Sequence, residues 1–173
     1  MVRGRAAPIA DPDDAAAAEA VAVRILAGAA QSEAGLRRRL EQRGFTRAVA
    51  AATAAAMVRR GYVDDDAFAA ALAERGLRRG RGRALVAAEL RARGVAERPI
   101  DDAVRGIDPD AELVAATVAA ARLAASRAGR DGFDAGRVRG YVGGALQRRG
   151  FDMGTVRRAL QAAGLDGTDE LLP

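Results

Sequence analysis

The side chains of this sequence that could do chemistry form an acidic run and an arginine-rich segment. The acidic run, Asp64-Asp65-Asp66, has the composition of a metal site. Successive residues of a helix point in different directions, however, so three adjacent carboxylates make a poor chelate. Because Ala67-Phe68 follows at once, the run is better explained as a helix cap and a first turn whose negative charge complements the helix dipole. The sequence therefore predicts neither a metal site nor a cofactor.

Groups that could catalyse a reaction are scarce. The chain has no His and no Cys, which excludes imidazole acid–base chemistry, thiol nucleophiles and the usual N/S zinc sites. The serines, Ser32 and Ser126, have no such base to activate them. Gly80-Arg81-Gly82 lacks the spacing and the following Lys of a phosphate-binding loop. We therefore expect that the protein is not an enzyme.

Arginine dominates the charge of the chain. The net charge is +5, and all 28 basic residues are Arg. Smaller clusters lie at residues 37–39 and at Arg148, Arg149, Arg157 and Arg158. The largest cluster has a single acidic residue, Glu89, among seven arginines: Arg75, Arg78, Arg79, Arg81, Arg83, Arg91 and Arg93. Planar guanidinium groups suit phosphates and carboxylates, so these seven are the predicted contacts to a nucleic acid or an acidic protein. The alternative is a solvated face in an Arg-biased proteome.

Two features disfavour simple nucleic-acid readout. No aromatic residues are interleaved with the arginines, although base stacking normally supplies affinity for single strands. No predicted helix combines Asn, Gln, Ser and Arg at the spacing that reads base edges, so a sequence-specific helix-turn-helix is also disfavoured.

The composition predicts an all-α fold. Half of the 173 residues are hydrophobic, many of them Ala, and only 3% are aromatic. Ala is the strongest helix former, and alternating strand patterns are absent. No apolar run reaches the roughly 20 residues of a membrane span. The basic start is followed by Pro8 and Asp11 instead of an apolar segment, so we expect no signal peptide and a cytoplasmic protein.

Caps and glycines divide the chain into nine predicted helices. N-caps are expected at Asp13 or Asp14, Ser32, Thr46, Asp64 and Asp108, the last followed by a first-turn Pro. The segment 78–83 should separate the fourth helix from the fifth, because two of its residues are glycines. Helix ends are expected at Gly44, Gly61, Gly94, Gly150 and Gly164. The third helix should bury Val49, Thr53, Ala56 and Met57, and Phe68 and Leu72 should anchor the fourth.

One phrase recurs three times without gaps. Leu36-RRR-Leu40-EQ-Arg-Gly-Phe45 is followed by Val86-AAE-Leu90-RA-Arg-Gly-Val95 and Val142-GGA-Leu146-QR-Arg-Gly-Phe151. A period near 50 residues with a helix on each side indicates a helical repeat array. We therefore predict three tandem three-helix repeats, at residues 13–60, 61–107 and 108–165, that form an elongated, curved array. The basic N-terminus, 1–12, should be disordered and the tail, 166–173, frayed.

The chain resembles the RecX family of regulatory proteins. The resemblance rests on Gly61-Tyr-Val-Asp-Asp65 with Phe68-Ala69, on Gly80-Arg-Gly82, and on Glu89-Leu90 with Gly94-Val95. It extends over roughly residues 15–165. Gly35 departs from the expected Glu of a Ser-x-x-Glu capping box, and the usual Lys content is replaced by Arg.

The resemblance implies a monomeric modulator of the RecA recombinase. Members of the family bind the RecA–DNA filament, in its groove or at its growing end, and suppress strand exchange, ATP hydrolysis and coprotease activity. Whether single- or double-stranded DNA is contacted directly stays open. Two other interpretations compete with this one. The protein could bind nucleic acid by itself, independently of RecA, or serve as a helical scaffold for another partner.

Overall fold

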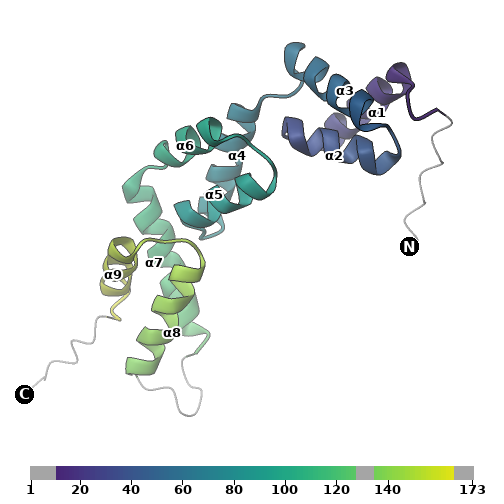
Figure 1. Ribbon diagram of the computed structural model, residues 1–173. Coiled ribbons are helices and arrows are strands. Elements are labelled where there is room, and N and C mark those ends of the chain that lie inside the picture. Colours follow the sequence, from purple (N-terminus) through teal and green to yellow (C-terminus); the bar gives the residue numbers. More distant parts are fainter. Residues whose placement is uncertain (1–10, 128–134, 166–173) are drawn as a thin grey trace, which may run out of the picture. The chain divides into compact units, whose positions relative to one another are not determined.

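The computed structural model describes residues 11–127 and 135–165, and in these ranges every regular element is an α-helix. The helices lie in the order expected (Figure 1): α1 Ala15–Gly28, α2 Glu33–Arg43, α3 Arg47–Arg59, α4 Asp65–Arg78, α5 Arg83–Ala92, α6 Glu97–Arg105, α7 Pro109–Ala125, α8 Ala135–Arg148 and α9 Met153–Ala162. The all-α fold class is thereby confirmed. Of the N-terminus predicted to be disordered, residues 1–12, only Asp11 and Pro12 are described, and the Pro12 carbonyl accepts from the Thr46 N–H at 3.0 Å. Residues 1–10 and the tail predicted to be frayed, 166–173, lie outside the described residues.

The predicted caps start their helices. The side chains of Asp14, Ser32, Thr46 and Asp108 accept hydrogen bonds from the first-turn N–H groups of α1, α2, α3 and α7. Asp64 does the same for α4, since its carboxylate accepts from the Ala67 N–H at 2.9 Å. These side chains satisfy donors that an α-helix leaves without intrahelical partners.

The recurring Arg-Gly phrase ends three helices in the same way. Gly44, Gly94 and Gly150 all have positive φ, which an L side chain rarely adopts. The N–H of the following hydrophobe then bonds back to a carbonyl in the last turn, Phe45 to Leu40, Val95 to Leu90 and Phe151 to Leu146. Each of those hydrophobes is buried. This is a Schellman stop, in which the glycine and the hydrophobe together close the helix end.

The chain divides into two compact units. Unit 1 comprises residues 1–69 and 90–100, and unit 2 comprises 70–89 and 101–173, so α4, α5 and α6 are shared between them. The division of the sequence into three repeats stays a prediction. Among the described residues no helix is long and apolar enough to cross a bilayer.

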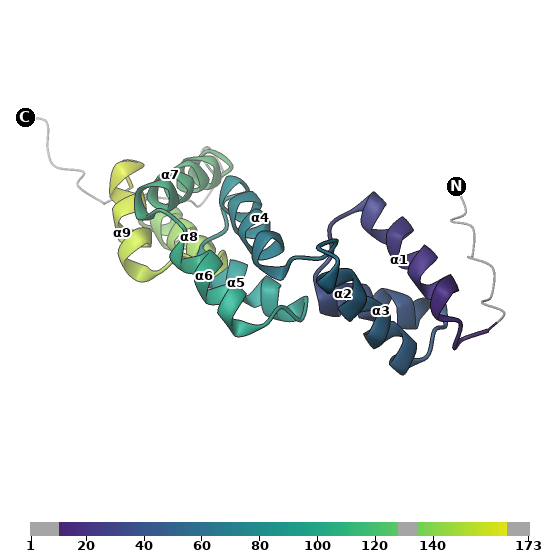
Figure 2. The same cartoon turned by 90° about the horizontal axis from the view of Figure 1, so that it is seen from above.

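In unit 1, α1, α2 and α3 form a small three-helix bundle, seen from a second direction in Figure 2. Its core is built on Leu36, Leu40 and Met57, which are fully buried, and on Ala residues that let the helices approach closely. The predicted stripe of α3 needs a correction. Thr53 and Met57 are buried as expected, together with Ala50 and Ala54, whereas Val49 and Ala56 are only half-buried.

In unit 2, α7 contacts both α8 and α9, which also contact each other. Val142, Leu146 and Val156 pack against the Ala-lined side of α7 formed by Ala116, Ala119 and Ala120. Small residues on α7 allow the two helices to lie close to it, so a core with few large side chains is still well packed.

One contact occurs once in each unit. Ser32 and Gly82 hold matching positions, four residues before the first hydrophobe of the recurring phrase. In unit 1 the Ser32 hydroxyl donates to the Arg93 carbonyl at 3.0 Å. In unit 2 the Gly82 N–H donates to the Arg149 carbonyl at 2.8 Å. In unit 1 the start of α2 thus binds the Arg-Gly turn that ends α5, and in unit 2 the start of α5 binds the Arg-Gly turn that ends α8.

Candidate functional site

The acidic run of α4 takes part in three separate contacts. Asp64 caps the helix, the Asp65 carboxylate accepts from the Glu33 N–H at 2.8 Å, and Asp66 pairs with Arg98 at 2.7 Å. In the part of the chain that the structure describes, no three acidic side chains are placed to hold a metal ion together. The run joins α4 to its neighbours in unit 1.

The Arg/Gly turn between α4 and α5 has a structural reason for both of its glycines. Gly80 has a φ of 68° and ends α4. Gly82 lies so close to the Arg149-Gly150 turn that an added Cβ would be 2.4 Å from the Gly150 carbonyl oxygen. The Ala84 N–H also donates to that oxygen, at 3.2 Å. The turn is therefore held against the end of α8, and its backbone has little room for variation.

The seven candidate arginines are not all available to a partner. Five belong to unit 2 and two, Arg91 and Arg93, to unit 1. Arg78 pairs with Glu74 and Arg81 with Glu89. Arg91 makes two hydrogen bonds of 2.8 Å to Glu97, and these lower the pKa of the Glu97 carboxyl below its usual value.

Arg83 is committed to the interior of unit 2. Its Nε lies 2.6 Å from the carboxylate of Glu112, and its backbone N–H also donates to Glu112, at 3.0 Å. A second guanidinium nitrogen bonds the Ile107 carbonyl at 2.6 Å. The Glu112 side chain is only 4% exposed, so it depends on these donors. The sequence offered no sign of this pair, because the two residues lie on different helices.

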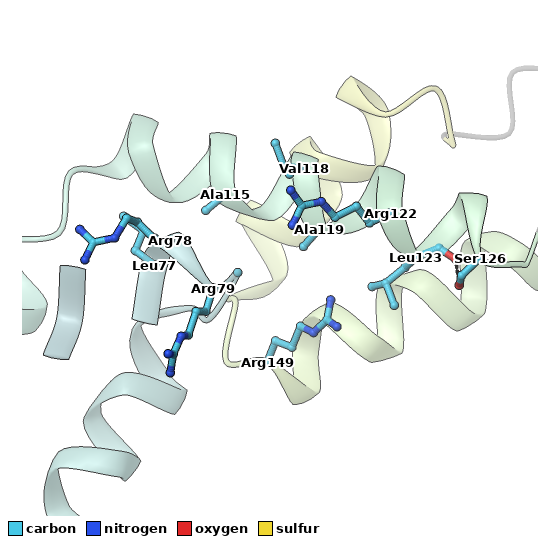
Figure 3. A pocket seen from close by; sticks show the side chains of 11 residues that line it. Leu77, Arg78, Arg79, Ala115, Val118, Ala119, Arg122, Leu123, Ser126 and Arg149 are labelled. Carbon is cyan, nitrogen blue, oxygen red and sulfur yellow. Dashed lines mark hydrogen bonds between the residues drawn. The ribbon is translucent and has the colours of Figure 1, made fainter. Parts of the chain in front are cut away.

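An arginine-lined groove of about 380 Å³ lies in unit 2. Figure 3 shows the guanidinium groups of Arg79, Arg122 and Arg149 coming from the α4–α5 turn, from α7 and from the end of α8. Arg78 also lines the groove, and Leu77, Val118, Ala119 and Leu123 supply apolar surface. No carboxylate belongs to its lining. The lining of the groove includes two of the predicted contact residues, Arg78 and Arg79. It also includes Arg122 and Arg149, which were not among the predicted contacts.

The groove combines positive charge with an apolar floor. Val118, which lines the groove, is 44% exposed. Guanidinium groups beside apolar surface can hold carboxylates or phosphates while the floor buries part of the ligand. The positive charge and the apolar surface of the groove together suit an acidic and partly apolar segment of another protein.

Known proteins resemble the chain in both sequence and fold. Residues 64–104 match the model described as RecX, second three-helix domain. A regulatory protein RecX of Mycolicibacterium vanbaalenii is 40% identical over an alignment that covers 55% of this chain and 52% of that protein, about half of each. The regulatory protein RecX of Thermobifida fusca is 37% identical over 91% of this chain and 86% of its own length. The chain belongs to the RecX family.

The crystal structure of RecX from Lactobacillus salivarius has the same fold. It superposes with a TM-score of 0.74 over 88% of this chain and 97% of that one, at 12% identity. The predicted membership in the RecX family and the helical fold it implied are thus both confirmed.

Proposed function

We propose that this RecX-family protein binds the RecA–DNA filament and lowers the ATPase, strand-exchange and coprotease activities of RecA. It does so as a cytoplasmic monomer, by binding and without catalysis. Support comes from its membership in a family of regulatory proteins and from the groove of unit 2, where Arg78, Arg79, Arg122 and Arg149 surround apolar surface. Positive charge there would steer the protein toward an acidic filament surface.

The predicted arginines are ranked by their internal contacts, and the contact surface that we propose is formed by those of unit 2. Arg75 and Arg79 are exposed, and their side chains make no ion pair among the described residues. Arg78, Arg81 and Arg91 share their charge with a glutamate, and Arg83 holds buried Glu112. Reversing Arg83 would place two carboxylates together, so it would test the fold instead of the contact.

The proposal is tested by titrating this protein into RecA filaments that hydrolyse ATP on single-stranded DNA. We expect inhibition well below stoichiometric amounts. The double variant Arg79→Glu/Arg122→Glu should need about tenfold more protein for half-maximal inhibition, because charge near the contact is reversed. The matched control is Arg157→Glu/Arg158→Glu, which makes the same charge change on exposed positions of α9 in the same unit. Equal potency of the two variants would refute the groove as the contact. Absence of inhibition by the parent protein would refute the function.

A second measurement separates this function from binding of nucleic acid alone. At matched salt, a filament regulator should bind the RecA-coated strand more tightly than the bare strand. Equal affinity for the two would favour a nucleic-acid-binding protein that acts independently of RecA.

A further inference from the structure

A second, smaller pocket lies in unit 1 and has a different chemistry. Its volume is about 200 Å³, and it is lined by α2 and the two residues before it, together with one residue of α4 and one of the α5–α6 turn: Gln31, Ser32, Gly35, Arg38, Arg39, Gln42, Phe68 and Arg93. Three guanidinium groups, two amide side chains and one aromatic ring therefore surround a single space. As in the groove of unit 2, no carboxylate belongs to the lining.

The fold brings Phe68 to the arginines of α2. The start of α4 is tied to the start of α2 by the hydrogen bond from the Glu33 N–H to Asp65, at 2.8 Å. Phe68, one turn further along α4, is half-buried and faces the pocket. The sequence has no aromatic residue interleaved with its arginines, so the proximity of Phe68 to the arginines of α2 arises only from the tertiary structure.

Another part of the lining is held by the Arg93 backbone. Its carbonyl accepts from the Ser32 hydroxyl at 3.0 Å and from the Arg38 guanidinium at 2.7 Å. Arg38 is thereby positioned by the protein itself. The side chains of Arg39 and Arg93 make no ion pair among the described residues, and both are exposed at the pocket. These two are the cations available to a ligand.

We propose that this pocket binds one nucleotide of a single strand of DNA. Phe68 would stack on the base, Arg39 and Arg93 would hold the flanking phosphates, and the amides of Gln31 and Gln42 would hydrogen-bond base edges. Every base has a face that can stack on an aromatic ring, so such a pocket would accept any of the bases. Guanidinium groups match the geometry of phosphates. The pocket is smaller than the roughly 300–1,000 Å³ of sites for drug-sized ligands, which suits one planar group.

The aromatic ring and the two amides favour a nucleotide over an acidic peptide. A carboxylate ligand would use the guanidinium groups alone and would gain nothing from a stacking surface. The groove of unit 2 has apolar aliphatic walls and neither an amide nor an aromatic ring in its lining. The two sites therefore suit different ligands. Binding here requires no RecA, so this inference and the proposed function stand or fall separately.

The test is fluorescence anisotropy of a labelled oligodeoxythymidine with the full chain, in the absence of RecA, over a series of salt concentrations. Phe68→Leu keeps apolar volume but removes the ring, and it should weaken binding by about 5- to 100-fold while leaving the salt dependence unchanged. Arg39→Gln should weaken binding and reduce the slope of log K against log salt by about 0.7, the value for one phosphate of a single strand. Circular dichroism confirms that each variant is folded.

The matched control for Arg39→Gln is Arg47→Gln, an exposed position on α3 of the same unit that does not line the pocket. It should change affinity by less than about twofold. If Arg47→Gln weakened binding as much as Arg39→Gln, the arginines would act only through net charge and the inference would be wrong.

A strand with abasic positions separates stacking from phosphate contact. The parent protein should bind it more weakly than oligodeoxythymidine, whereas Phe68→Leu should bind the two alike. Equal binding of the two strands by the parent protein would overturn the inference. Competition with an acidic peptide gives a second way to overturn it. If the peptide displaced the DNA from Phe68→Leu and from the parent protein at the same concentration, the pocket would recognise negative charge only.

Discussion

At the scale of single residues, the arginines of this protein divide into structural and available groups. Arg83 supplies three hydrogen bonds to buried partners, while Arg79, four residues earlier, is exposed and lines the groove of unit 2. The same side chain thus serves the interior at one position and a surface at the other. The difference lies in whether a helix nearby presents a buried carboxylate.

Replacing Arg83 by Ala should therefore destabilise the fold. Glu112 would keep the Arg83 backbone N–H but would lose the Nε donor and the positive charge, and the Ile107 carbonyl would lose its guanidinium donor. Because Arg83 is itself 33% exposed, we expect a loss of about 2 kcal/mol, below the roughly 3–5 kcal/mol of a fully buried pair. Urea unfolding measures the change. Arg79→Ala is the control and should alter stability by less than about 0.5 kcal/mol.

The pair can also be removed as a whole. Arg83→Met combined with Glu112→Leu should recover part of the lost stability, because no unpaired charge remains buried. If Arg83→Ala were as stable as Arg79→Ala, the carboxylate of Glu112 would not need its partner.

At the scale of elements, six helices, α1, α2, α3, α4, α7 and α9, each start on one short polar side chain. Asp152 is an example in unit 2, where its carboxylate accepts from the Thr155 N–H at 3.0 Å and from the Thr155 hydroxyl at 2.7 Å. These hydrogen bonds to the charged form lower the pKa of Asp152 below its usual value. The helix start is thereby coupled to pH.

The stability that Asp152 contributes should disappear in acid. A carboxyl whose pKa is lowered by folding stabilises the protein above its unfolded pKa, near about 3.9, and this contribution is lost as the pH falls through the lowered value. Thermal melts of the parent protein and Asp152→Asn should thus converge below about pH 4. Asn still caps a helix, so at neutral pH the variant isolates the charge.

Asp152→Ala removes the cap itself and should cost about 1 kcal/mol at pH 7. If the stability difference between the parent protein and Asp152→Asn were the same at pH 3 and pH 7, the ionised carboxylate would not be the stabilising form.

At the scale of the whole molecule, the helices that carry the recurring phrase are joined by a contact used twice, once within each unit. The start of α2 binds the Arg93-Gly94 turn, and the start of α5 binds the Arg149-Gly150 turn. In the first contact, an added Cβ at Gly94 would be 2.7 Å from the Ala34 Cβ, and in the second, one at Gly82 would be 2.4 Å from the Gly150 carbonyl oxygen. Neither contact therefore leaves space for a side chain at its glycine. The recurring Gly94 and Gly150 therefore serve the packing of these helices on one another as well as the helix stops.

Gly82→Ala should weaken this junction in unit 2. The new methyl group would meet the Gly150 carbonyl oxygen at 2.4 Å, and backbone cannot yield as a flexible side chain would, so we expect a loss of about 2 kcal/mol. Urea unfolding monitored by circular dichroism measures the change.

The control is Gly140→Ala in α8, where an added Cβ meets nothing within 4 Å. It should stabilise the protein by up to about 1 kcal/mol, since Ala is a better helix former than Gly. A Gly82→Ala variant as stable as the parent protein would show that the junction opens at little cost.

Much of the fold could be predicted from sequence because its signals are local. Ser32, Thr46, Asp64 and Asp108 cap helices through groups two or three residues away, and Gly44, Gly94 and Gly150 end them within one turn. The phrase Gly61-Tyr-Val-Asp-Asp65 with Phe68-Ala69 also indicated the family correctly. These features require only the geometry of one helix and its ends.

Only the tertiary structure decided how the arginines are used. The pairing of Arg83 with Glu112 and the gathering of Phe68 with Arg39 and Arg93 join segments that no local pattern relates. Side-chain pairing across helices depends on which faces pack together, and an Ala-rich chain has little in its sequence to specify that. Hence the helices and their ends followed from the amino-acid sequence, whereas the two candidate binding sites emerged only from the packing.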